Sequence, residues 1–133
     1  MRLVVDTNVF ISGIFFTGPP HRILDAWRRS KVELVVDATI LAEYRDTGLE
    51  LAAQFDGVEL APWLDLLTVK AKMMETTCLE EPVCTDPDDD KFLACALASR
   101  SRFVVTGGKA LLRTSGYKGL TVLTPRAFVN AHL

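Results

Sequence analysis

The sequence predicts an α/β fold in which a largely parallel sheet is covered by helices on both faces. Short runs rich in β-branched residues alternate with longer segments of helical periodicity, which is the pattern of βαβ units. These runs are too apolar to leave one face of the sheet in water, so helices are expected on both sides. The chain has 133 residues, the usual size of one domain. We therefore expect residues 1–133 to form a single domain.

The order of the elements follows from where the apolar runs and the breakers fall. Strands are predicted for residues 2–6, 33–37, 102–106 and 120–124. Helices are predicted for residues 23–31, 40–53, 60–74, 91–98 and 125–129. We expect Gly48 to end or bend the second helix, Asp88 or Asp89 to open the fourth, and Thr124 to cap the last.

Charge and composition limit the possible function. Fifteen basic and seventeen acidic residues give a net charge of −2, so no overall positive field attracts nucleic acid or an acidic membrane. No apolar run is long enough to span a membrane, and Asp6 stands where a signal peptide needs an apolar residue. The three cysteines and two histidines have no zinc-site spacing. We expect a cytoplasmic protein without membrane association, in which any binding of a polyanion is local.

Asp6 is the most informative single residue. It ends the first predicted strand and is followed by Thr7 and Asn8, where the chain leaves the sheet. In open α/β sheets, ligands bind at this carboxyl edge. The simpler interpretation is a helix N-cap, which each of the three residues can supply. A cap explains one of them but not all three.

A second group of acids lies in residues 86–90, where four of five side chains are carboxylates. The dipole of the following helix accounts for one or two of them. Carboxylates this close together repel one another unless a cation lies among them, and Mg²⁺ and Mn²⁺ take oxygen ligands of this kind. Asp90 lies one turn before Ala94 on the apolar face, so we expect Asp90 to point inward and Asp88 and Asp89 to act as caps.

Glu43 is the third candidate, about two turns into the helix that follows the second strand. Alone, it would belong to an exposed face with Asp46 and Glu50. Asp37, at the end of that strand, is better explained as a cap. Together with Asp6 and the acids of residues 86–90, however, Glu43 can meet a common edge of the sheet.

Four segments in this order and spacing resemble the PIN domain family: VDTNVFIS from Val5, LAEY from Leu41, DPDDDKFLA from Asp86 and VVTG from Val104. The resemblance is narrower to the small prokaryotic PIN proteins described as toxins of toxin–antitoxin systems. It implies a three-layer α/β/α sandwich with a mainly parallel sheet, and an endoribonuclease that uses Mg²⁺ or Mn²⁺. It also implies RNA as substrate, a protein antitoxin and a homodimer.

Matched residue by residue, the resemblance implies three metal-binding acids, an active-site polar residue and two orienting hydroxyls: Asp6, Glu43 and Asp90, then Asn8, then Thr7 and Ser12. Basic side chains near the acids are candidates for contacts with phosphate, although each is also typical of an ordinary surface: Arg22, Lys91, Lys109, Arg113 and Lys118. Three aromatic residues, Trp27, Phe55 and Trp63, suit an interface but are more typical of a core.

The chain departs from the family pattern after the strand that ends at Thr106. Gly108 stands where a fourth acid is usual, and Ala110 stands where a fifth often follows. This leaves a second hypothesis, a degenerate PIN domain retained for binding RNA or protein. A receiver domain, which accepts a phosphoryl group on an aspartate, is an alternative of another class. It fits less well because receivers carry an acid pair after the first strand, where this chain has Asp6 followed by Thr7 and Asn8.

Overall fold

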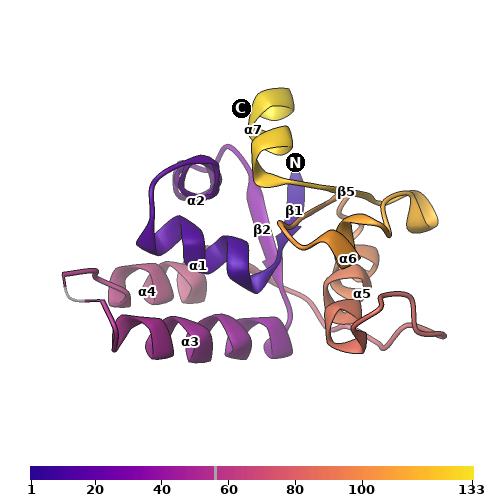
Figure 1. Ribbon diagram of the computed structural model, residues 1–133, viewed down its shortest axis with the longest axis horizontal. Coiled ribbons are helices and arrows are strands. Elements are labelled where there is room, and N and C mark those ends of the chain that lie inside the picture. Colours follow the sequence, from indigo (N-terminus) through magenta and orange to yellow (C-terminus); the bar gives the residue numbers. More distant parts are fainter. Residues whose placement is uncertain (56) are drawn as a thin grey trace.

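The described part of the chain, residues 1–55 and 57–133 of a computed structural model, contains a five-stranded parallel sheet with the order β3-β2-β1-β4-β5 (Figure 1). From edge to edge its strands are β3 (Lys72–Met73), β2 (Glu33–Val36), β1 (Arg2–Val5), β4 (Phe103–Val105) and β5 (Thr121–Leu123). The four predicted strands are confirmed, each one or two residues shorter than expected. The sequence did not predict β3.

Helices cover the sheet on both sides, as predicted, and form a three-layer α/β/α sandwich. In Figure 1, four helices lie to the left of β1 and β2: α1 (Thr7–Phe15), α2 (Pro19–Arg28), α3 (Ala38–Ala52) and α4 (Ala61–Lys70). On the right lie α5 (Asp90–Ser99), α6 (Lys109–Leu112) and the short 3₁₀ helices η1 (Pro87–Asp89) and η2 (Tyr117–Gly119). The last helix, α7 (Pro125–His132), packs on α2. Within residues 1–55 and 57–133, every helix is too short or too polar to span a bilayer.

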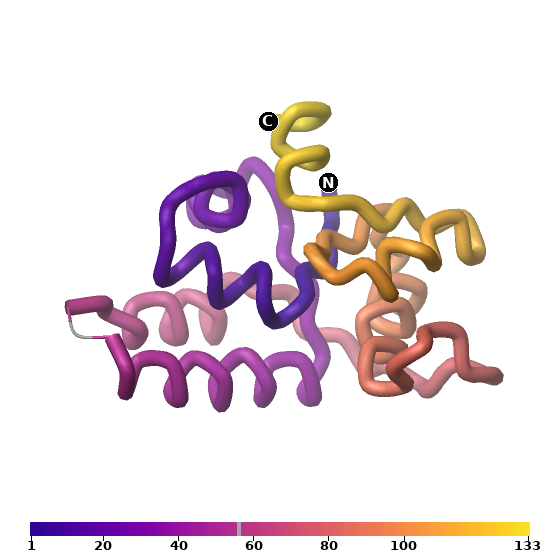
Figure 2. Tube along the Cα trace, viewed as in Figure 1, coloured from indigo at the N-terminus to yellow at the C-terminus, as the bar shows by residue number. Residues whose placement is uncertain are grey.

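The core lies on both faces of the sheet because the central strands carry apolar side chains on both. Leu3, Val4 and Val5 of β1 are completely buried. Behind them, the ring of Phe10 from α1 stacks on Tyr44 from α3, with ring centroids 4.2 Å apart. The two chain ends lie near each other (Figure 2), and Met1, His132 and Leu133 line one cavity.

The predicted helix 60–74 ends early, at Lys70. Residues 72 and 73 instead pair with Val35 and Val36 as a parallel edge strand. Helical spacing of apolar residues suggested the longer helix, but the side chain of Met73 is 51% exposed and needs no apolar partner. Pairing satisfies backbone groups along the open side of β2, which periodicity does not reveal.

Gly48 neither ends nor bends its helix, contrary to our expectation. The helix α3 runs through it to Ala52, and a Cβ atom at Gly48 would lie 3.1 Å from Leu60 Cδ1. This glycine therefore allows the segment before α4 to pack closely on α3. At the start of α7, the predicted cap is confirmed, since Thr124 Oγ1 accepts a hydrogen bond from the Ala127 amide at 3.1 Å.

Tyr44 ties α3 to the sheet, which yields a prediction. Its fully buried hydroxyl donates a hydrogen bond to the carbonyl oxygen of Val5. Changing Tyr44→Phe keeps the stack on Phe10 but leaves that carbonyl without this donor. We expect the free energy of unfolding to fall by about 1–3 kcal/mol in urea denaturation. Tyr117→Phe is the control, because it removes the hydroxyl of a half-buried tyrosine on η2 rather than on α3. An equal loss in both variants would contradict the role of the buried bond.

Candidate functional site

The pairing of β1 with β4 determines which residues meet at the carboxyl edge of the sheet. In the parallel register Val5 lies opposite Val105. The amide of Asp6 then donates to the Val105 carbonyl oxygen at 3.0 Å, so the residues that follow the two strands, Asp6 and Thr106, lie side by side.

Asp6 serves both as a cap and as an acid at the sheet edge. Its Oδ1 accepts from the Val9 amide at 2.9 Å and caps α1, while its Oδ2 accepts from the Thr106 hydroxyl. Burial raises the pKa of Asp6, the two hydrogen bonds lower it, and the nearby negative charge of Glu43 adds to the rise. The side chain is 8% exposed. Asp6 is thus a fixed carboxylate whose charge is disfavoured by its surroundings.

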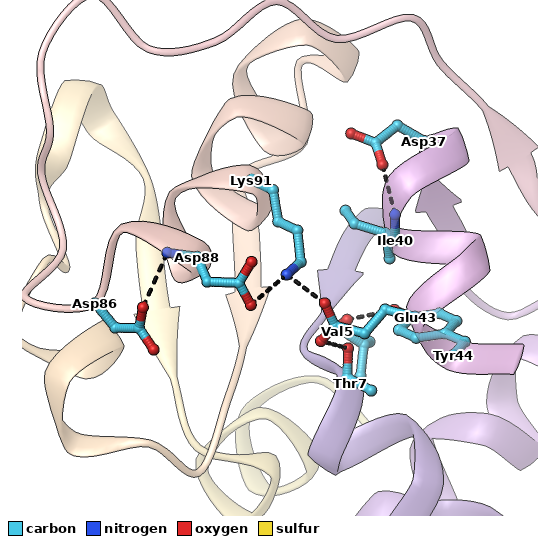
Figure 3. A network of polar contacts seen from close by, with 9 residues as sticks. All are labelled: Val5, Thr7, Asp37, Ile40, Glu43, Tyr44, Asp86, Asp88 and Lys91. Atoms are coloured by element: carbon cyan, nitrogen blue, oxygen red, sulfur yellow. Dashed lines mark hydrogen bonds and ion pairs between the residues drawn. The ribbon is translucent and has the colours of Figure 1, made fainter. Parts of the chain in front are cut away.

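Glu43 is brought to this edge by α3, whose next residue, Tyr44, is bonded to Val5. The hydroxyl of Thr7 donates to Glu43 Oε1 at 2.5 Å, which links the start of α1 to the middle of α3 (Figure 3). The structure therefore brings Asp6, Thr7 and Glu43 together, and the orienting hydroxyl expected at Thr7 contacts one of the acids.

Lys91, in the first turn of α5, is a third residue in contact with the acids. Its ammonium is paired with Glu43 Oε2 and lies 2.9 Å from Asp88 Oδ2 (Figure 3). Burial works to lower the pKa of Lys91, but the two carboxylates outweigh it and raise the pKa. Sequence reasoning treated this residue only as one of several possible phosphate contacts.

The acids of residues 86–90 are arranged differently from our expectation. Asp86 caps η1, since its Oδ1 accepts from the Asp88 amide at 3.0 Å. Asp89 stands at the N-cap position of α5, as expected, but its side chain makes no capping hydrogen bond among the described residues. Asp90 turns towards the preceding loop, where its carboxylate accepts from the amides of Val83 at 3.2 Å and Cys84 at 2.7 Å. The expected inward direction of Asp90 is not what these contacts show. Its role as a metal ligand stays a prediction.

The negative charge of Asp6 contributes to the pKa of Asp89. Burial, followed by the negative charges of Asp86 and Asp6, raises the pKa of Asp89. Helical spacing from Ala94 predicted that Asp90 points inward. The 3₁₀ turn at residues 87–89, which precedes α5, changes the angle between successive residues in this segment. The Asp-Pro pair at the start of the segment was the available signal, since proline favours the first position of a helical turn.

The other predicted residues differ in how near they lie to Asp6 and Glu43. Asn8 is exposed and lines a hollow of about 350 Å³ with Ser12, Gly107 and Gly108. Arg22 lines the cavity at the chain ends, away from the acids. The remaining basic candidates, Lys109, Arg113 and Lys118, are exposed on the side of α6.

The side chains at the centre have the chemistry of a Mg²⁺ or Mn²⁺ site but are not yet arranged as one. Carboxylate and hydroxyl oxygens are the donors these ions take. In the described ranges, however, no three acidic, histidine or cysteine side chains are grouped closely enough to hold a metal as they stand. By its chemistry the donor set fits such an ion, and one Glu43 oxygen is paired with Lys91.

The different surroundings of Asp89 and Asp90 predict opposite effects of removing their charges. Burial raises the pKa of Asp90, but hydrogen bonds from Cys84 and Val83 lower it more, so its ionised form stabilises the fold above its ordinary pKa and this contribution is lost as the pH falls. The raised pKa of Asp89 means that its ionisation costs stability as the pH rises. At pH 7, we expect Asp90→Asn to lower the free energy of unfolding by about 1 kcal/mol and Asp89→Asn to leave it unchanged or higher. Urea denaturation at pH 7 and pH 3.5 checks this, and a larger loss at pH 7 in Asp89→Asn would contradict it.

Comparison with known proteins places this arrangement in a family. An uncharacterized protein of Methanocaldococcus jannaschii is 29% identical over 118 residues, which cover 84% of this chain and 74% of that relative. The profile of the PIN domain family matches residues 2–110, from β1 into α6 and across all the acids described above. The receiver-domain alternative is therefore wrong. By this match and by its parallel α/β/α sandwich, the chain belongs to the PIN domain family.

Proposed function

We propose that this protein is a metal-dependent endoribonuclease that hydrolyses phosphodiester bonds of RNA and acts as the toxin of a toxin–antitoxin pair. PIN domains are generally nucleases that use divalent metal ions, which supports the reaction class. The observation that carries the proposal is the meeting of Asp6 and Glu43 at the carboxyl edge of the sheet, each fixed by a threonine hydroxyl.

In this proposal Asp6, Glu43 and an acid of residues 86–90 hold the ion. The sequence assigned that third position to Asp90. Asp89 is a second candidate for it, because the negative charge of Asp6 contributes to the raised pKa of Asp89. Thr7 and Thr106 orient the carboxylates by donating to one oxygen of each. A bound ion supplies a water of lowered pKa and neutralises charge that develops on the phosphate.

The rim of the site supplies the contacts with RNA. Asn8 and Ser12, on one face of α1, offer hydrogen bonds to phosphate oxygens along the hollow beside Gly108. Lys109 adds a positive charge next to the same glycine, and such contacts carry no sequence information. Because the chain has a net charge of −2, this local arrangement provides the attraction.

An antitoxin, a homodimer and a cytoplasmic location are part of the same proposal. Exposed apolar side chains near the end of α1 and α3 support a protein partner, since Phe16 and Phe55 pack edge-on with ring centroids 6.0 Å apart and are 53% and 41% exposed. Trp27, by contrast, is 1% exposed and belongs to the core.

A degenerate PIN domain that binds RNA without cutting it is the second candidate function. Two observations favour it. Gly108 offers no carboxylate where the family often has one, and the Glu43 carboxylate is already paired with Lys91.

Cleavage of a fluorescently labelled RNA with Mg²⁺ or Mn²⁺ tests the proposal. We expect cleavage that depends on the ion and is lost in Asp6→Asn, because this variant removes a charged ligand while its amide oxygen still accepts from Val9. The matched control is Asp46→Asn, an exposed aspartate on α3. Equal cleavage by Asp6→Asn would point to a contaminating nuclease. RNA binding without cleavage in the wild type would support the second candidate.

The site also predicts the effect of restoring an acid at Gly108. Its backbone has φ −82°, which any residue adopts, and a Cβ atom there would lie 3.5 Å from Thr106 Oγ1, the hydroxyl bonded to Asp6. The backbone at this position therefore does not require glycine. Gly108→Asp should tighten the metal midpoint of cleavage by about 10- to 100-fold.

Gly107→Asp is the matched control for this prediction. A Cβ atom at Gly107 meets no heavy atom within 4 Å, so the added charge lies in open space. Cleavage rate against Mg²⁺ concentration is the measurement. The same midpoint in the wild type and in a folded Gly108→Asp variant would show that position 108 does not serve the metal.

A further inference from the structure

The ammonium of Lys91 occupies an unusual position for a lysine in the first turn of a helix. Its side chain is 12% exposed, whereas its partners Glu43 and Asp88 are 32% and 74% exposed. The lysine is thus the least exposed of the three side chains, and the helix that carries it, α5, packs on the sheet.

The hydrogen bonds of Glu43 show what this ammonium displaces. One carboxylate oxygen, Oε1, accepts from the Thr7 hydroxyl, and the other, Oε2, is paired with Lys91. Both oxygens of Glu43 are thus engaged, and the hydroxyl of Thr7 is fixed at the start of α1. A second cation at Glu43 therefore competes with Lys91.

We propose that Lys91 is a positioning residue that holds the place of a cation at Glu43 in the metal-free protein and leaves it when a divalent ion binds. This inference rests on the proposed function, since it concerns the same acids. Lys91 neutralises Glu43 while the site is empty of metal, and it sets how tightly an ion is held afterwards.

Asp88 gives the displaced ammonium another partner. It is the more exposed of the two carboxylates and lies one turn before Lys91 on the same segment, 2.9 Å from Nζ (Figure 3). The flexible side chain of lysine can keep this contact while it leaves Glu43. The exchange therefore moves a positive charge from the centre to the rim without leaving the ammonium unpaired.

Mn²⁺ titration by calorimetry, together with melting curves with and without Mn²⁺, tests the proposal on the full chain. Lys91→Met removes the ammonium and keeps the length of the side chain. We expect it to bind Mn²⁺ about 10-fold more tightly than the wild type, on the scale of groups that support metal ligands. Its metal-free melting temperature should fall, since Glu43 and Asp88 lose their counter-charge, and its rise on adding Mn²⁺ should exceed that of the wild type.

Two further variants separate this role from a merely structural ion pair. Lys91→Arg keeps a cation and should restore the wild-type metal affinity. Lys70→Met removes another half-buried ammonium, which is bonded to the Arg28 carbonyl oxygen at 3.1 Å, and should not change Mn²⁺ binding. Lys91→Gln takes the place of Lys91→Met should circular dichroism show the latter unfolded.

The outcomes distinguish the inference from the function on which it rests. Unchanged or weaker Mn²⁺ binding in folded Lys91→Met, beside a wild type that binds the ion and cleaves RNA, would overturn the inference alone. No Mn²⁺ binding in the wild type and in either Lys91 variant, with no cleavage, would overturn both. Tighter binding in Lys91→Met that Lys91→Arg reverses supports the inference.

Discussion

The parallel register between β1 and β4 is the constraint on which the site depends. Because Val5 lies opposite Val105, the residues that follow them leave the sheet together, and Asp6 meets Thr106. A shift of one residue would turn every side chain of the strand to the other face and separate the pair. The same edge also fixes α3, since Tyr44 donates to the Val5 carbonyl oxygen. Backbone pairing thus sets the position of acids that come from different parts of the chain.

Charge balance within the protein allows this edge to fold without a metal. Gathering carboxylates in a half-buried place disfavours their ionised forms, which is why burial raises the pKa of Asp6. A helix amide donates a hydrogen bond to Asp6, and a hydroxyl and the Lys91 ammonium contact Glu43, and these contacts offset part of this cost. Asp6 and Glu43 are thus each held by contacts from elsewhere in the chain.

Gly108 shows how a family site can change without disturbing the fold around it. Its amide donates to Thr106 Oγ1 at 3.0 Å, and that hydroxyl donates onward to Asp6. The backbone at this position therefore already supports the first acid, and the missing carboxylate leaves space beside it. A nuclease with fewer acids and a binding domain share this geometry, and they differ in how well the remaining oxygens hold an ion.

The sequence by itself determined the fold class, the four longer strands and the place of Asp6, because apolar periodicity and strand ends are local patterns. Glu43 was identified only in combination with the other acids and by the resemblance to the PIN domain family. It also identified the caps at Asp37 and Thr124, each bonded to an amide three residues on. Only the tertiary structure decided that residues 72 and 73 join the sheet. It also decided that the Asp90 carboxylate accepts from the amide of Cys84 in the preceding loop, and that the charge of Asp6 contributes to the raised pKa of Asp89. These outcomes depend on backbone partners and on a 3₁₀ turn, which changes the rotation between successive residues, and no local pattern records that rotation.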